Sequence, residues 1–256
     1  DLEVIYTTRA GDTLIGLERQ FLASPFGWKG LKIRNRIGSP MHMPVGTPLR
    51  IPESWLRVEP RTARVVSLRG DVTIDGRPLQ VDAKVPAGSV LRTSGDAFVT
   101  LVMPDESRLT VQPGSEARLD KVQGFHGFDG QNTQIHLARG RVETSVAAQR
   151  GPAARYQIRT PTALVGVRGT EFRVGSDAVS QAAQAEVTGG EVRMSSTSGA
   201  ATALPAGYGL VAIPGQAIPA PRALLPAPQI KDVPTVFERV ELRFVFSPVN
   251  KAVAYR

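Results

Sequence analysis

Cysteine is absent from this chain of 256 residues. Its absence excludes disulfide bonds, thiolate catalysis and cysteine-based metal sites. Histidine is scarce as well, because only His42, His126 and His136 are present, and none belongs to a known metal-binding spacing. His126 and His136 flank a polar stretch that contains Asp129. A metal site and a hairpin loop are the alternatives there, and we favour the loop because no third ligand has suitable spacing. We expect no metal and no cofactor.

Motifs of common enzyme classes are also missing. The sequence contains neither a Gly-x-Ser-x-Gly nucleophile elbow nor a Gly-x-x-x-x-Gly-Lys phosphate loop. A glycosidase would need two carboxylates that face one cleft. Asp105 and Glu106 are adjacent in a turn-like stretch, so we expect them to point apart. We therefore predict no catalytic residues and a protein that is not an enzyme.

Long apolar runs are lacking too. No stretch of about eighteen apolar residues occurs, so we expect no membrane-spanning segment in this sequence. The chain does not open with a charged and then apolar leader, and we expect it to be the mature or trimmed form of an exported protein.

Positive charge is what the sequence has in excess. Lys and Arg number 31 against 23 Asp and Glu, a net charge of +8. Such an excess favours either nucleic acid or an anionic surface as a partner. The basic residues are scattered, and the densest cluster is Lys29, Lys32, Arg34 and Arg36. This cluster fits the solvated face of a short helix. We therefore expect no nucleic acid and interpret the charge as attraction to an anionic cell wall.

The texture of the sequence predicts four regions. Residues 1–56 predict a strand, two helices and a returning strand, and residues 57–213 predict antiparallel strands. Residues 214–232 are rich in proline, which is typical of a semi-rigid linker. Residues 233–256 alternate again and predict strands of an incomplete or truncated C-terminal sandwich. The fold class is mainly β: a small βααβ module followed by an all-β sandwich or roll.

Turn signals organise the second region. Asp75-Gly76 predicts a two-residue hairpin turn. Gly70, Gly140 and Gly190 each precede an x-Val pair and are expected to separate two strands. A repeated bend of this kind is compatible with a sandwich, a roll or a short solenoid.

Residues 4–53 carry a set of marks that resembles the LysM domain family. The marks are Tyr6, Gly11-Asp12-Thr13-Leu14, Leu17, Phe21, Trp28, Leu31, Asn35, Gly46 and Leu49-Arg50-Ile51-Pro52. Domains of this family bind peptidoglycan, chitin and related glycans that contain N-acetylglucosamine. The resemblance implies a groove with Gly11, Asp12, Thr13 and Leu14 on one side and Asn35, Arg36 and Ile37 on the other. Residues 36–45 depart from the family because they are rich in Met and Pro. The alternative is that the Gly-Asp-Thr-Leu stretch and Asn35 only cap helices.

Residues 64–213 resemble the FecR domain family. The more specific marks are Thr160, Pro161, Ala163, Val167, Arg168, Gly169, Thr170 and Phe172. FecR itself is a periplasmic sensor that passes an iron-citrate signal across the membrane to a sigma factor. For Arg168 and Glu171 we favour a surface ion pair over a functional role. The last twenty or so residues weakly resemble the start of a fibronectin type III repeat.

The two resemblances together lead to one functional expectation. We expect a periplasmic or envelope-associated bacterial protein that binds peptidoglycan through residues 1–56 and presents its β domain to an unidentified envelope protein. The alternatives are the ectodomain of a FecR-type transmembrane signalling protein and a cell-wall glycan hydrolase.

Overall fold

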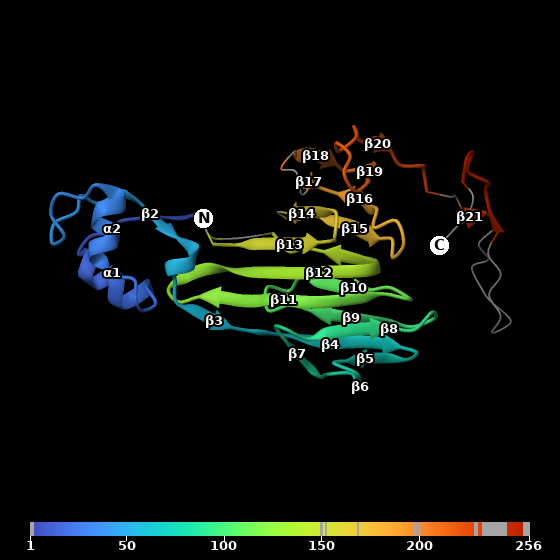
Figure 1. The fold of residues 1–256 in the computed structure, drawn as a ribbon, viewed down its shortest axis with the longest axis horizontal. Helices are drawn as coiled ribbons and strands as arrows, with labels where there is room; N and C mark the ends of the chain where they lie inside the picture. The colour runs from blue at the N-terminus through green and yellow to red at the C-terminus, as the bar shows by residue number, and fades with distance from the viewer. Residues whose placement is uncertain are drawn as a thin grey trace.

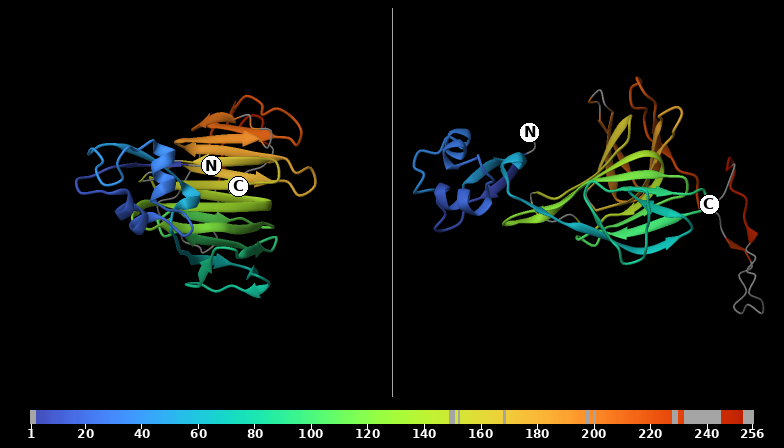
Figure 2. Two further views of the ribbon diagram at one scale, coloured as in Figure 1. Left: turned by 60° about the vertical axis from the view of Figure 1, so that its left-hand side comes forward. Right: turned by 60° about the horizontal axis from the view of Figure 1, so that its bottom comes forward.

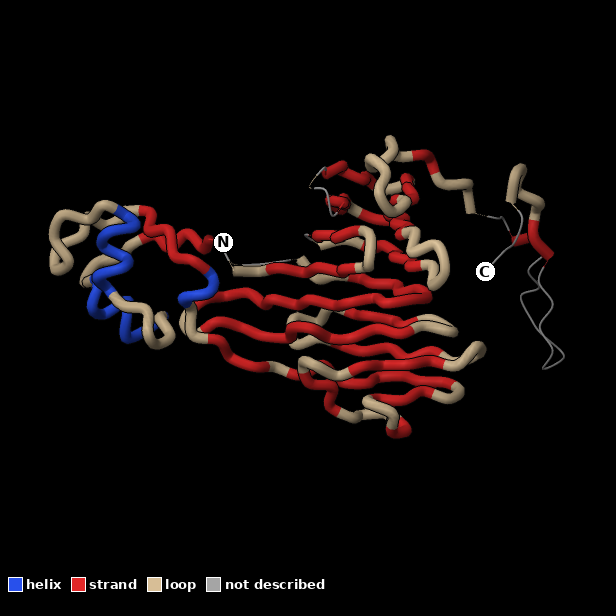
Figure 3. The backbone as a smooth tube through the Cα atoms, viewed as in Figure 1, coloured by secondary structure: helices blue, strands red, loops and turns tan. Residues whose placement is uncertain are grey.

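The computed structural model describes residues 3–148, 151, 153–167, 169–196, 199, 201–227, 230–231 and 245–252. Figure 1 shows a small helical module at one end of a broad stack of strands, and Figure 3 shows that both helices lie in that module. None of the described helices is long and apolar enough to cross a membrane.

The N-terminal module has the predicted order of elements. Its elements are β1 (Glu3–Thr7), α1 (Leu14–Phe21), α2 (Trp28–Asn35) and β2 (Pro48–Pro52). The two strands pair antiparallel, with Val4 opposite Ile51 and Tyr6 opposite Leu49. Leu14, Leu17 and Phe21 share one buried face of α1, as their helical spacing predicts. A short 3₁₀ helix, η1 (Glu53–Trp55), follows β2 and leads into the β domain.

The β domain consists of two sheets that share one long strand. Its strands are β3 (Val58–Pro60), β4 (Thr62–Arg69), β5 (Val72–Ile74), β6 (Arg77–Pro78), β7 (Lys84–Pro86), β8 (Val90–Thr93), β9 (Phe98–Val102), β10 (Arg108–Val111), β11 (Glu116–Phe125), β12 (Phe128–Ser145), β13 (Arg155–Arg159), β14 (Ala163–Val167), β15 (Glu171–Ser176), β16 (Ala183–Gly189), β17 (Glu191–Ser196), β18 (Ala201–Pro205), β19 (Tyr208–Ala212) and β20 (Arg222–Ala223). Sheet 1 has the order β6-β5-β8-β11-β12-β13-β14-β17-β18, and β3 pairs with the far end of β11. Sheet 2 has the order β7-β4-β9-β10-β12-β15-β16-β19-β20.

Strand β12 joins the two sheets into a flattened barrel. Its first part pairs with β11 and β13, and its last residues, from Gly140 on, pair with β15 and β10. Figure 2 shows the resulting two layers of strands with the helical module at one end. The mainly β fold class is therefore confirmed, and the open choice between a sandwich and a roll becomes a flattened barrel with two faces.

Three features of the strand plan test the turn signals. Asp75 and Gly76 form the predicted tight turn, because both have positive φ and Ile74 pairs with Arg77. Gly140 does not separate two strands, as its resemblance to Gly70 and Gly190 had suggested; it bends β12 from one sheet into the other. A side chain at Gly140 would collide with Ser115, whose Oγ would lie 2.2 Å from the added Cβ. The sheets are otherwise antiparallel, but β12 and β13 pair parallel.

The main hydrophobic core lies between the two sheets. It includes side chains with essentially no exposure from both layers, such as Leu91, Leu101, Ile158 and Val165. Alternation along each strand directs these residues inward and the polar ones outward. The two sheet faces that point away from this core are therefore the surfaces available for binding.

The end of the described chain is attached to the β domain. Residues 213–224 run over sheet 2, and Arg222 of β20 pairs with Gly209 of β19. Residues 230–231 (β21) and 245–246 (β22) pair with each other. Most of the strands expected in residues 233–256, including Leu242 and Phe244, lie outside the described residues.

Candidate functional site

Two loops lie side by side at the end of the module that faces away from the β domain (Figure 1). The first connects β1 to α1, and the second connects α2 to β2. The backbone N–H of Leu14 donates to the carbonyl of Pro40 at 3.0 Å. The N–H of Thr8 donates to Thr47, and the N–H of Gly46 donates back to Thr8. The structure thus places side by side the two segments that the resemblance assigns to the two sides of a groove, and we call these two loops the distal loops.

The first wall is built around Asp12. The Asp12 carboxylate accepts hydrogen bonds from the Tyr6 hydroxyl and from the Arg9 backbone N–H, each at 2.7 Å. Burial of Tyr6, together with its hydrogen bond to Asp12, raises the pKa of the Tyr6 phenol to about 12. Gly11 is exposed and has a positive φ of 85°, and a Cβ added there would have no atom within 4 Å. Asp12 therefore organises the loop, and Gly11 leaves its surface open.

Thr13 and Leu14 mainly serve the module's own fold. The Thr13 side chain accepts a hydrogen bond from the Gly16 N–H at 3.0 Å and is the N-cap of α1. Leu14 is completely buried. The only polar groups that Leu14 could offer a ligand are its backbone groups, and its N–H is already bonded to Pro40.

The second wall shows a similar division of roles. The Asn35 side chain donates to the carbonyls of Leu31 and Arg50 and accepts from the Arg50 N–H at 2.7 Å. Asn35 therefore ties α2 to β2, a role that its position in the sequence did not reveal. Arg36 follows with a positive φ of 54° and is exposed, whereas Ile37 packs partly against the module core. Among the seven predicted groove residues, Gly11 and Arg36 are the exposed ones.

The module core is completed by the β domain, which sequence reasoning missed. Phe125 and Phe128 flank the turn between β11 and β12 and belong to the same buried cluster as Leu17 and Phe21. The rings of Phe21 and Phe128 lie 4.5 Å apart. Gly127 lies in the turn between Phe125 and Phe128. A Cβ added at Gly127 would lie 2.3 Å from the Phe21 ring. The sequence did contain a signal for this contact. Glycine-rich turns are usually polar, so two phenylalanines in such a turn indicate that it is buried against another part of the protein.

A buried polar contact accompanies this apolar junction. The side-chain amide of Asn132 in β12 donates to a carboxylate oxygen of Glu53 in η1 at 2.5 Å. Both side chains are buried. Burial of a polar group is costly unless it is hydrogen-bonded, so this pair favours one docked position of the module on the β domain.

Several of the described FecR-type marks in residues 160–172 serve the fold itself. The hydroxyl of Thr160 accepts from the backbone N–H groups of Thr162 and Ala163 and thereby shapes the turn between β13 and β14. Val167 and Phe172 lie in the main core. Arg168 lies outside the described residues, and Glu171 is exposed at the start of β15.

The three histidines do not converge on one another. His126 lies in the β11–β12 turn, where its Nδ1 is 2.9 Å from the Glu59 carboxylate. His136 is ten residues further on and pairs in register with Arg118 and Arg159 on sheet 1. Asp105, one of the two adjacent carboxylates that we expected to point apart, accepts from the Ser107 N–H within the β9–β10 turn.

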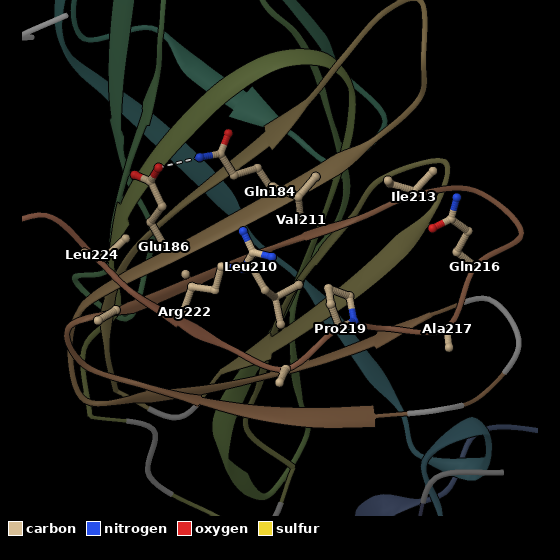
Figure 4. A pocket seen from close by; sticks show the side chains of 13 residues that line it. Gln184, Glu186, Leu210, Val211, Ile213, Gln216, Ala217, Pro219, Arg222 and Leu224 are labelled. Atoms are coloured by element: carbon tan, nitrogen blue, oxygen red, sulfur yellow. Dashed lines mark hydrogen bonds between the residues drawn. The ribbon is translucent and has the colours of Figure 1, made fainter. Parts of the chain in front are cut away.

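A pocket of about 430 Å³ lies where the chain leaves the β domain (Figure 4). Gln184 and Glu186 of β16 are hydrogen-bonded to each other on its floor, and Arg222 faces them from the segment that follows β19. Leu224 covers Gly209, where a Cβ would lie 2.9 Å from the leucine. The pocket is therefore a by-product of how residues 213–224 pack on sheet 2.

Comparison with known proteins identifies the β domain. A family model described as FecR protein matches residues 89–193. This region is a FecR family domain. It runs from β8 into β17 and so forms the centre of both sheets. The match confirms the predicted resemblance over this range. No curated protein matches the sequence.

Two crystal structures of a protein provisionally described as an anti-sigma factor, from Parabacteroides distasonis, resemble part of the chain. Each is 15% identical in sequence, and the TM-scores are 0.44 and 0.43. The matched region covers 52% of this chain and 59% of the other. The chain thus spans less than two thirds of the length of these proteins. A likeness of this size says nothing about what either protein binds.

Proposed function

We propose that the chain is the extracytoplasmic part of a FecR-type signalling protein, whose β domain contacts an envelope protein. The observation that carries the proposal is the FecR family match over residues 89–193. These residues supply the shared strand β12 and the middle of both sheets, so the match lies in the centre of the fold. A contact made on either sheet face would be held by this rigid frame.

Measurement of transcript levels in mutant strains tests this proposal. In the source bacterium, the complete gene is deleted and then restored in three forms: unchanged, with Val165→Asp in the main core, and with Val179→Asp on the surface. Val165 is fully buried and Val179 is 94% exposed, so the first substitution disrupts the β domain and the second is the matched control. We expect deletion and Val165→Asp to change the same sigma-factor-dependent transcripts. Unchanged transcripts in the deletion strain would contradict the signalling role.

We propose as a second function that the distal loops bind a glycan containing N-acetylglucosamine, such as peptidoglycan. The observation that favours it is the pairing of the two loops at the free end of the module, which leaves Gly11, Arg36, Met41 and Val45 exposed. Exposed backbone donors and acceptors in such loops match the hydroxyl and acetamido groups of sugars.

Co-sedimentation with protein-free peptidoglycan tests this second function. The whole chain is compared with the double variant Met41→Asp/Val45→Asp, and Val179→Asp serves as the control. All three positions are exposed, so no variant disturbs the core. We expect the double variant alone to lose binding at about 0.5 M salt, where simple charge attraction is screened. Equal pelleting of all three proteins would contradict the loop assignment, and loss of wall turbidity would instead favour the hydrolase alternative.

Deletion of residues 1–56 is a poor version of this experiment. Removal of the module would expose Phe125 and Phe128, which it buries. Exposed apolar patches promote non-specific association, so a truncated chain could pellet for the wrong reason. Point variants in the whole chain avoid the problem.

A further inference from the structure

The outer face of sheet 1 carries basic residues on β11, β12, β13 and β17, four of five adjacent strands, with β14 between the last two. In one row, His136 of β12 lies between Arg118 of β11 and Arg159 of β13. In the next row, Lys121 is opposite Gln134, Gln134 opposite Gln157, Gln157 opposite Gly166, and Gly166 opposite Arg193. We call the residues Lys121, His136, Arg155, Arg159 and Arg193 the basic face.

In neither row does an acidic residue stand directly opposite a basic one: His136 separates Arg118 from Arg159, and Gln134, Gln157 and Gly166 separate Lys121 from Arg193. These rows therefore lack the opposite-charge cross-strand pairs that stabilise sheets. The outer face of sheet 2 shows the stabilising alternative: Arg173 lies between Glu143 and Glu186, at 3.0 Å and 3.9 Å from their carboxylates. Both faces belong to the same barrel, so the difference between them points to a role for the basic face outside folding.

The carboxylates of sheet 1 near β8 and β11 already form ion pairs with arginines. Glu116 bonds to Arg92 at 3.0 Å and lies 3.8 Å from Arg139. Asp120 bonds to Arg118. By contrast, Arg159 and Arg193 are exposed and have no ion-pair partner among the residues that the structure describes. Arg159 and Arg193 therefore give the basic face positive charge that no carboxylate of the described residues pairs with.

A groove of about 600 Å³ borders the basic face at Arg155 and Arg193. Gln157 and Gly166 lie on its floor, and Arg155 and Arg193 line it. The start of β1 adds Glu3 and Ile5, and the first residue of β17 adds a carboxylate, that of Glu191. The Glu3 carboxylate is already paired with Arg34, which leaves Glu191 as the acidic group at the rim. A side chain at Gly166 would find its nearest neighbour atom 3.9 Å away, so the floor is open above this residue.

The floor offers amide groups between the basic walls. The Gln134 side chain donates to the Gln157 side-chain oxygen at 3.3 Å. This bond leaves the Gln157 amide hydrogens and the Gln134 oxygen for other partners. Guanidinium groups form paired hydrogen bonds with carboxylates, and side-chain amides donate to and accept from hydroxyl groups. A strand of acidic sugars presents both groups at short intervals.

We propose that the basic face binds a carboxylate-bearing polysaccharide strand. Among the described residues, the face contains no exposed aromatic anchor of the kind that dominates protein interfaces, which favours an acidic glycan over an acidic protein. This surface is distinct from the distal loops. It rests on the proposed function only for its envelope location, where such polymers occur.

The test measures binding of the whole chain to fluorescently labelled polygalacturonate. The test variant is Arg159→Glu/Arg193→Glu, and the control is Arg69→Glu/Arg108→Glu. Both pairs are exposed and change the net charge equally, but the control pair lies on the strands of sheet 2. We expect the test variant to weaken binding at least about tenfold, because both guanidinium groups and their charge-assisted hydrogen bonds to the polymer carboxylates are lost. The control variant should bind within about twofold of the unchanged protein.

Several outcomes would overturn the proposal. Equal weakening in both variants would show attraction by net charge alone. If neutral dextran bound as tightly as polygalacturonate, the charge of the polymer would not contribute to binding. If polyphosphate bound as tightly, the surface would bind polyanions in general. Circular dichroism checks that each variant is folded, and Arg159→Gln/Arg193→Gln repeats the test without charge reversal. Met41→Asp/Val45→Asp should leave polygalacturonate binding intact, so failure of the distal-loop function and failure of this proposal are distinguishable.

Discussion

The N-terminal module and the β domain differ in where the residues of their hydrophobic cores come from. The β domain buries its core between its own two sheets. The module, from residue 3 to residue 56, completes its core with Phe125 and Phe128 of the β domain. A chain of about fifty residues buries a smaller share of its surface than a larger domain does. The comparison teaches that the module is small enough to need a partner surface, and that this partner fixes its position.

Removal of one phenylalanine from each core tests whether the module depends on the β domain for its stability. Phe172→Ala empties a site in the main core, and Phe128→Ala empties one at the junction. Each should cost about 3–5 kcal/mol, with the junction site at the lower end because Phe128 retains 8% exposure. Thermal unfolding followed by circular dichroism measures both. If Phe128→Ala left the unfolding of the whole chain unchanged, the module would not depend on the β domain.

Two glycine substitutions test the same contact between the module and the β domain, with a smaller expected change in the free energy of unfolding. Gly127→Ala must adopt a φ of 73° and place its Cβ 2.3 Å from Phe21, whereas Gly76→Ala, at a φ of 79°, has no atom within 4 Å. The strain of positive φ alone costs about 1–2 kcal/mol, and steric overlap adds about 1–3 kcal/mol. Gly127→Ala should therefore lower the free energy of unfolding more than Gly76→Ala does. Equal losses in denaturant titrations would mean that the hairpin tip does not contact α1 closely.

The smallest expected effect is a dependence on alkaline pH that is specific to the module. The pKa of Tyr6 is raised from 10.0 to about 12 in the folded protein, so the folded state holds this proton more tightly than the unfolded state. The resulting stability is complete below pH 10 and is lost as the pH rises toward about 12. Burial also raises the pKa of Tyr156 in the β domain, which supplies a background common to all variants.

Comparison with Tyr6→Phe isolates the contribution of the module. Melting temperatures are measured between pH 9 and about pH 12 for both proteins. The unchanged protein should lose more stability over this interval than Tyr6→Phe. Parallel curves would show that the Tyr6–Asp12 hydrogen bond does not depend on the folded module.

The sequence predicted local structure better than contacts between regions. The spacing of Leu14, Leu17 and Phe21 predicted α1, and Asp75-Gly76 predicted a hairpin, because both depend on neighbouring residues alone. The bend at Gly140 could not be distinguished from the strand breaks at Gly70 and Gly190, because only the packing against Ser115 requires it. Strand β12 was therefore divided in two at the sequence level.

The same limit applies to the candidate sites. The sequence predicted which residues lie in the distal loops, and the capping alternative for the Gly-Asp-Thr-Leu stretch anticipated the role of Thr13. It did not reveal that the Asn35 side chain ties α2 to β2. The basic face could not be predicted either. Its residues are spread from Lys121 to Arg193, and only the register of five strands brings them together.

Hydrogen exchange of the whole chain, followed by mass spectrometry, tests most directly whether the module and the β domain form one unit. The account predicts that amides in α1 and at the tip of the β11–β12 hairpin open together, and that Phe128→Ala lowers the protection of both while the strands β15 and β16 stay protected. If α1 exchanged on its own and its protection did not change in Phe128→Ala, the shared core would not couple the two regions, and the account would be wrong.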